Sequence, residues 1–213
     1  MKKCLCLLLS LVTLFLLVSC DLPSFIEDLK KDDQKEKIEP IRGTIEGDVY
    51  KNEYLGFEFT KPTSWVYSTD KEIAEMVDLG AEMILGDNFE QTLKNNPTVY
   101  DMMVVDTITR TNLNIGYENL SKTLSANITI EQYIEALKSQ LGDVSGMKVT
   151  FPDTYETAKL GETEFAKVVC PITMQGVSMK QVYYLRKTDG YMCFVIVTIP
   201  SGYTVSQIEA MFK

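Results

Sequence analysis

Three acidic residues in the middle of the chain are the groups whose types and placement could do acid–base chemistry. Asp101 and Asp106 lie in the segment YDMMVVDT, and Glu118 lies in LNIGYEN; both segments have the composition of β-strands. Two carboxyl groups that face each other can divide the roles of general acid and general base. Carboxylates of this kind more commonly cap strand ends or face solvent. We therefore expect no catalytic residue among the three.

The absence of histidine narrows the chemistry further. The chain of 213 residues contains none. This excludes Ser-His-Asp and Cys-His catalysis and every zinc site that uses imidazole. The sequence also contains no EF-hand loop, P-loop or GxGxxG run. We expect neither a metal nor a cofactor, and the sequence favours a protein that is not an enzyme.

Polar residues alternate with apolar ones in the segment NLNIGYENL. Asn112, Asn114 and Glu118 share one side of this predicted strand, and apolar residues share the other. A polar strand face either lines a small cleft for a ligand or partner, or marks a solvent-facing edge. We favour the edge and keep these three residues as the candidate ligand or partner surface.

The start of the chain predicts export and lipidation. Lys2 and Lys3 precede an apolar run that ends at Leu17-Val18-Ser19-Cys20, which resembles the bacterial lipobox. The run is too short for a spanning helix. An ordinary secretory peptide cut near Ser19 is the alternative, but it leaves the position of Cys20 unexplained. We expect residues 1–19 to be a lipoprotein signal peptide, Cys20 to carry the lipid, and the lipid to hold the chain on the outer face of the cytoplasmic membrane.

The charge pattern divides the rest of the chain. Residues 20–42 are rich in both acidic and basic residues and predict a charged flexible tether, although Ser24 and Glu27 could instead cap a short helix. Residues 43–213 suit one globular domain. Loss of the signal peptide with its two lysines changes the net charge from −9 to −11. An acidic chain is repelled by phosphates, so no nucleic-acid partner is expected.

The last third of the chain predicts an antiparallel meander. Strands 164–174, 178–186 and 191–199 are joined by Gln175-Gly176 and by Asp189-Gly190, and the second pair is a type I′ hairpin signal. The strand YMCFVIVTI is apolar on both faces, which predicts cover on both sides of the sheet. Amphipathic patterns with capping residues predict helices after Thr69, Thr129 and Thr204, and a further helix over 81–95.

The strand register of the same meander indicates whether the two cysteines of the domain can form a disulfide. The loops place Cys193 opposite Arg186 and Cys170 opposite Gln181, several rungs apart and beyond the ~7 Å that a disulfide tolerates between α-carbons. We therefore predict that Cys170 and Cys193 are buried free thiols and that no disulfide forms.

The segments YKNEYLGFEFTKPTSW, YENL followed by TIEQYIEALKSQL, and YYLRKTDGYMCFVIVTIP occur in an order that resembles a PsbP/Mog1-like domain, as carried by uncharacterised bacterial lipoproteins. The resemblance implies an α+β fold in which an antiparallel β-sheet is flanked by helices on both faces, an α/β/α sandwich. Known relatives serve as accessory or binding proteins, one in assembly of a photosystem and one bound to a small GTPase. No partner-contacting residue of those relatives can be matched here.

These observations give two functional hypotheses. The first is a lipid-anchored extracytoplasmic binding or accessory protein without catalytic activity, whose partner is an envelope protein or a small ligand. The alternative is a carboxylate-dependent enzyme acting on cell-envelope polymers. A two-lobed solute receptor is disfavoured because about 171 residues make a single domain of ordinary size.

Overall fold

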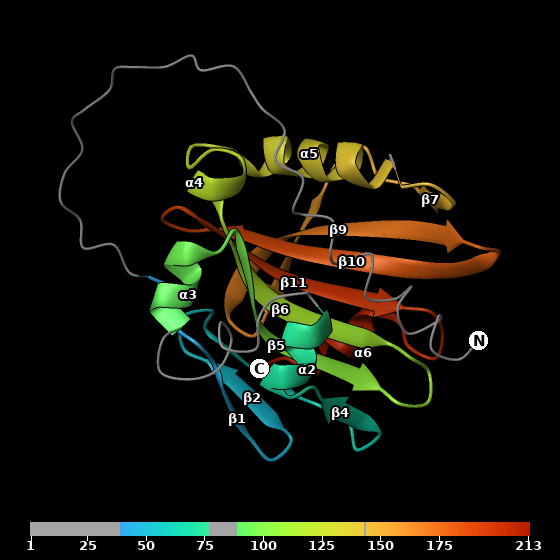
Figure 1. The fold of residues 1–213 in the computed structure, drawn as a ribbon. Coiled ribbons are helices and arrows are strands. Elements are labelled where there is room, and N and C mark those ends of the chain that lie inside the picture. The colour runs from blue at the N-terminus through green and yellow to red at the C-terminus, as the bar shows by residue number, and fades with distance from the viewer. Residues whose placement is uncertain (1–38, 77–88, 143) are drawn as a thin grey trace, which may run out of the picture.

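The computed structural model of the chain describes residues 39–76, 89–142 and 144–213 (Figure 1). The predicted signal peptide, Cys20 and the tether up to residue 38 lie outside the described residues, and so does the first part of the helix predicted over 81–95. Residues 41 and 42, which the charge pattern places in the tether, contact the body of the protein.

The described residues form an α+β fold built on antiparallel sheets. The larger sheet has the strand order β4-β5-β6-β11-β10-β9-β7, and β8 also pairs with β9. Its strands are β4 (Trp65–Tyr67), β5 (Thr98–Asp106), β6 (Asn112–Asn119), β7 (Met147–Val149), β8 (Glu156–Leu160), β9 (Thr163–Met174), β10 (Val177–Lys187) and β11 (Tyr191–Ile199). The smaller sheet contains β1 (Thr44–Glu46), β2 (Val49–Asn52) and β3 (Phe57–Thr60). Every strand pair in the described residues is antiparallel, as predicted.

The helices of the described residues are α2 (Asp70–Met76), α3 (Phe89–Asn95), α4 (Leu120–Thr123), α5 (Ile130–Gly142) and α6 (Val205–Glu209). Helices α2, α5 and α6 begin where the capping residues predict, whereas the short helix α4 is not predicted. The Thr204 hydroxyl accepts from the Gln207 N–H at 3.2 Å, and the Gln207 side chain accepts from the Thr204 N–H at 2.9 Å. The same reciprocal pairs precede α2 and α5, so each of the three helices has two of its free N–H groups satisfied. None of the helices in the described residues has the length and apolar character needed to cross a bilayer.

Two apolar clusters lie on the two sides of the larger sheet, and strand β11 contributes to both. All nine of its residues are buried. Cys193, Val195 and Val197 belong to core 1, which also contains residues of the smaller sheet and of α6. Phe194 and Ile196 belong to core 2, which also contains residues of α2 and α5. The smaller sheet and α5 lie at opposite ends of the view in Figure 1.

The meander has the predicted register but not the predicted turn. Arg186 pairs with Cys193, and Gln181 pairs with Cys170, as the loop positions require. The expected type I′ turn is wrong for Asp189-Gly190, since only its glycine has positive φ. Type I′ requires positive φ at both central residues. Gln175 and Gly176 have φ of 51° and 80°, so the type I′ signs occur in the other hairpin.

Candidate functional site

The carboxylate of Asp101 is buried in a polar network that holds the start of the body in place. Its Oδ2 accepts from the Tyr50 hydroxyl at 2.6 Å and from the Asn52 amide at 2.9 Å. The backbone N–H of Gly43 donates to the same oxygen at 3.0 Å. The guanidinium of Arg42 lies 3.8 Å from Oδ1 and also pairs with Asp70. Asp101 therefore stabilises the fold and is covered by residues of this chain.

Burial has a clear electrostatic effect on this network. It raises the pKa of the Asp101 carboxyl above its ordinary value, and the surrounding donors and Arg42 oppose that rise. Burial also raises the pKa of the Tyr50 phenol well above 10. The Tyr50 phenol is therefore protonated at neutral pH and acts as the hydrogen-bond donor to Asp101.

Asp106 is the cap of the turn between β5 and β6. Its Oδ1 accepts from the Ile108 N–H at 3.1 Å, and its Oδ2 accepts from the Thr109 hydroxyl at 2.6 Å. Burial acts to raise the pKa of Asp106, but these donors outweigh it and lower the pKa below the ordinary value. The expectation that such a carboxylate caps a strand end is confirmed for Asp106.

Glu118 is buried under helix α5, where Tyr133 donates its hydroxyl to Oε2 at 2.5 Å. Only 1% of Glu118 is exposed, so the expectation of a solvent-facing carboxylate is wrong here. Burial raises the pKa of Glu118, against the opposing effect of the Thr123 and Tyr133 hydroxyls. The side chain adjoins core 2, because its partner Tyr133 belongs to that cluster.

Asp101 and Glu118 occupy opposite faces of the sheet. The Asp101 network includes Tyr50 and, through Asn52, the hydroxyl of Tyr117, and both tyrosines belong to core 1. Tyr117 and Glu118 are consecutive in β6, and consecutive side chains of a strand point to opposite faces. The two carboxyls therefore cannot act together as acid and base. Among the described residues, no group of three acidic, cysteine or histidine side chains is placed to hold a metal ion.

Strand β6 is central, so the prediction of a solvent-facing edge around Asn112 and Asn114 is wrong. It pairs with β5 on one side and with β11 on the other. Asn114 is only 6% exposed, and its amide donates to the Asn112 side chain at 3.4 Å. The cross-strand neighbours of Asn114 are Met103 and Ile196, and its hydrogen-bond partner lies on the same strand. The sequence of β6 alone does not reveal that this polar face is buried.

Neighbouring strands extend this face into a buried polar band. Asn112 pairs with Thr198 of β11, and Thr198 pairs with Gln181 of β10. The Gln181 amide donates to the Thr198 hydroxyl at 3.2 Å, and the Tyr183 hydroxyl donates to the Gln181 carbonyl. No sequence pattern singles out Gln181, Tyr183 and Thr198, because their contacts join two different strands. Glu118 does not join the band, although it shares its strand face with Asn112 and Asn114.

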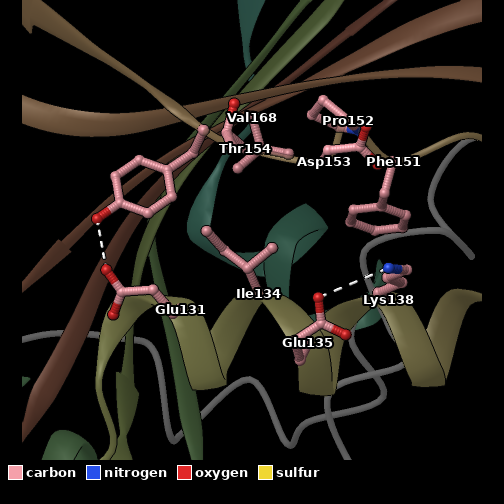
Figure 2. Close-up of a pocket in the computed structure, with 10 residues that line it drawn as sticks. Glu131, Ile134, Glu135, Lys138, Phe151, Pro152, Asp153, Thr154 and Val168 are labelled. Carbon is pink, nitrogen blue, oxygen red and sulfur yellow. Dashed lines mark hydrogen bonds and ion pairs between the residues drawn. The ribbon is translucent and has the colours of Figure 1, made fainter.

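A groove lies between helix α5 and the loop 151–155, and we call it the α5 groove (Figure 2). Its volume is about 200 Å³. Figure 2 shows Ile134 of α5 and Phe151 of the loop directed toward the same space, with Val168 of β9 beside them. The other lining residues are Glu131, Glu135, Lys138, Pro152, Asp153, Thr154 and Tyr155. The groove thus has an apolar floor and a charged rim.

The groove opens where the edge of the larger sheet is interrupted. Strand β7 pairs with β9 as far as Val149↔Ile172, and β8 resumes the pairing at Glu156↔Lys167. The connecting residues 150–155 are more numerous than the β9 residues 168–171 that they pass. The loop must therefore leave the plane of the sheet. Tyr155, at its end, contacts α5, because its hydroxyl donates a hydrogen bond to the Glu131 carboxylate at 2.7 Å. No sequence motif marks this site, because it depends on where the loop meets α5.

Cys170 and Cys193 are both buried and free, as predicted. Cys170 belongs to core 2 and Cys193 to core 1. Burial raises the pKa of each thiol to about 12. Because the thiolate is the reactive form, burial and the raised pKa disfavour a nucleophilic role for either cysteine.

No model of a known protein family matches the sequence, and no curated protein matches it either. Among solved structures, a crystal structure of a protein from Bacteroides thetaiotaomicron VPI-5482 is similar, with 13% sequence identity and a TM-score of 0.39. The match covers 74% of this chain and 44% of that one. The chain thus spans less than half the length of this structural neighbour.

Proposed function

We propose that the protein is a lipid-anchored extracytoplasmic binding or accessory protein without catalytic activity, and that the α5 groove is its binding site. The observation that carries this proposal is the groove itself. It combines a buried apolar floor at Val168 with exposed charged groups at its rim, and binding sites are commonly lined by apolar side chains with a few polar groups that fix orientation. An envelope protein or a small ligand would use the apolar floor for affinity and the rim for orientation.

The placement of the carboxylates supports a role without catalysis. Asp101 is covered by the segment that contains Gly43, and Glu118 is covered by α5 through Tyr133. The alternative, a carboxylate-dependent enzyme acting on cell-envelope polymers, requires two carboxyls that reach one substrate. The opposite faces occupied by Asp101 and Glu118 speak against it.

The proposed anchor is Cys20, and its lipid is the proposed contact with the membrane. Two or more acyl chains give stable anchoring, since each buried methylene contributes about 0.8 kcal/mol. The body begins close to the end of the proposed tether, because the Tyr117 hydroxyl donates to the Ile41 carbonyl at 3.2 Å. This contact would join the tether firmly to the sheet on the outer side of the cytoplasmic membrane.

The finer architecture belongs to the same proposal. In an α/β/α sandwich of the PsbP/Mog1-like kind, helices flank both faces of the antiparallel sheet. Support comes from α5, whose Leu137 lies in core 2, and from α6, whose Ile208 lies in core 1. The smaller sheet also contributes Phe57 and Phe59 to core 1 and shares that side with α6.

Two measurements test the proposed function. Metabolic labelling with palmitate should mark the wild-type protein and not a Cys20→Ala variant, because only the cysteine thiol can carry the lipid. A photo-crosslinking residue introduced at Thr154, on the groove rim, should then capture a specific partner in intact membranes. The same residue at Thr44, an exposed position of β1 in the smaller sheet, is the matched control. Unlabelled wild-type protein, or identical products from the two positions, would contradict the proposal.

A further inference from the structure

The α5 groove has dimensions suited to one long side chain. Its volume of about 200 Å³ is below the roughly 300–1,000 Å³ typical of sites for drug-sized ligands. Ile134, Phe151 and Val168 supply an apolar lining along which an unbranched aliphatic stem can be buried. The groove remains open to solvent at a rim of exposed residues, so a polar end group would stay hydrated.

The charges at the rim of the groove favour one sign of charge on the polar end group of the bound side chain. The lining residues carry three carboxylates, those of Glu131, Glu135 and Asp153, and one ammonium group, that of Lys138. The hydrogen bond from Tyr155 lowers the pKa of Glu131, which keeps its carboxylate ionised at neutral pH. The whole chain carries a net charge of −9, which adds to the negative potential around the groove. A cationic group is therefore favoured over a neutral or anionic one.

On the α5 side of the rim, an ammonium group fits better than a guanidinium. Arginine binds carboxylates best through both oxygens at once. One oxygen of Glu131 already accepts from Tyr155, and one oxygen of Glu135 lies 3.6 Å from the Lys138 ammonium. The Glu135–Lys138 pair is exposed on both sides and is correspondingly weak. A point charge on a flexible stem can displace Lys138 from Glu135 without needing a free bidentate carboxylate.

Resting on the proposed function, we propose that the α5 groove receives a lysine side chain from a segment of a partner protein. The aliphatic stem lies between Ile134 and Phe151 over Val168, and the ammonium group lies at the acidic rim. The partner segment itself then passes over the outside of the groove. Charge complementarity at the rim and the size of the groove both argue for this occupant.

The test uses the full chain in detergent micelles with isotope-labelled isoleucine and valine methyl groups. The probe is the blocked tripeptide acetyl-Gly-Lys-Gly-amide, and its matched control carries norleucine, which has a similar stem and no charge. The lysine probe should shift the Ile134 and Val168 methyl resonances saturably. It should bind at least about fivefold more tightly than the norleucine probe, and added salt should reduce this difference.

Two variants test whether the Glu135 carboxylate contributes to binding of the lysine probe. Glu135→Gln should weaken binding of the lysine probe about two- to fivefold and leave the norleucine probe unaffected. Glu75→Gln, which changes an exposed helical glutamate of α2 paired with Lys71, should affect neither probe. Equal affinity for lysine and norleucine, or an unchanged affinity in Glu135→Gln, would overturn the lysine assignment. Specific crosslinking from Thr154 would still hold in that case, so the proposed function would stand or fall separately.

Discussion

The Tyr50 hydroxyl donates a 2.6 Å hydrogen bond to Asp101, although the two residues are 51 positions apart and both are almost fully buried. The bond joins the smaller sheet to strand β5 of the larger one. Gly43 donates to the same carboxylate, so the first residues of the body are tied to both sheets. A single buried acceptor thus joins residues 43–52 to strand β5, about 50 positions further along the chain.

Replacing Asp101 by Asn should destabilise the fold by about 1–3 kcal/mol. The Asn carbonyl oxygen can take the place of Oδ2, which accepts from Tyr50 and Asn52. Its amide nitrogen then lies where Oδ1 was, facing the Gly43 N–H and the Arg42 guanidinium, which are donors, and the charge that pairs with Arg42 is lost. Urea unfolding of the two proteins measures the difference. Asp153→Asn is the matched control, since this exposed residue should change the free energy of unfolding by less than about 0.5 kcal/mol. An Asp101→Asn protein as stable as wild type would contradict the role assigned to the carboxylate.

Gly116 in β6 should not tolerate a side chain. A Cβ atom there would lie 2.5 Å from the Phe194 ring and 2.6 Å from the Val99 carbonyl oxygen, and the backbone oxygen cannot move aside cheaply. Gly116→Ala should therefore lower the free energy of unfolding by about 1–3 kcal/mol. Gly142→Ala at the end of α5 meets nothing within 4 Å and should leave stability unchanged or slightly raised. Thermal unfolding of both variants checks the contrast, and equal melting temperatures would refute it.

Local patterns predict much of the sheet. The register that places Cys170 and Cys193 apart follows from the positions of two short loops, and a two-residue loop leaves little freedom in how its strands pair. The burial of β11 on both faces follows from its uninterrupted apolar composition. The starts of α2, α5 and α6 follow from capping pairs that are only three residues apart. All of these features depend on neighbours in the chain, which is why sequence reasoning reaches them.

The sites depend on contacts that no local pattern contains. The polarity of Asn114 predicts a solvent-facing position, yet the residue lies in a central strand and is only 6% exposed. Asp101 is satisfied by Tyr50, Asn52 and Gly43, whose distance along the chain hides the relationship. The α5 groove forms because a loop leaves the sheet edge beside a helix. The sequence gives the type of each residue, but tertiary packing determines which residues it contacts.

Cys170 and Cys193 should be unreactive toward thiol reagents in the native protein. Both are fully buried, and burial raises the pKa of each thiol to about 12, so very little thiolate is present at mildly alkaline pH. Mass spectrometry after brief treatment with an alkylating reagent should find both unmodified before denaturation and modified after it. A Ser178→Cys variant, with its thiol at an exposed position of β10, should react at once. Modification of either native cysteine at the rate of the introduced one would contradict their burial.

Glu118 should make the folded state less stable as pH rises. Burial raises its pKa in the folded state above the ordinary value of 4.5, which applies in the unfolded state. Between the unfolded-state pKa and the folded-state pKa, the native state therefore binds more protons than the unfolded state. Stability contributed by this group is fully present below the unfolded pKa and is lost as pH rises through the folded pKa. Glu118→Gln keeps an acceptor for the Tyr133 hydroxyl and removes the titration. The stability of wild type relative to this variant should therefore fall as pH increases from about 4.5.

Glu72 provides a control with the opposite sign. Hydrogen bonds from Thr69 at the start of α2 lower its pKa, so its contribution is present above the unfolded pKa and is lost as pH falls through the folded pKa. The stability of wild type relative to Glu72→Gln should consequently rise with pH. Urea unfolding at a series of pH values measures both differences on the same protein. A Glu118→Gln difference that is flat with pH, or that rises as the Glu72→Gln difference does, would mean that Glu118 is not held in a buried site beneath α5.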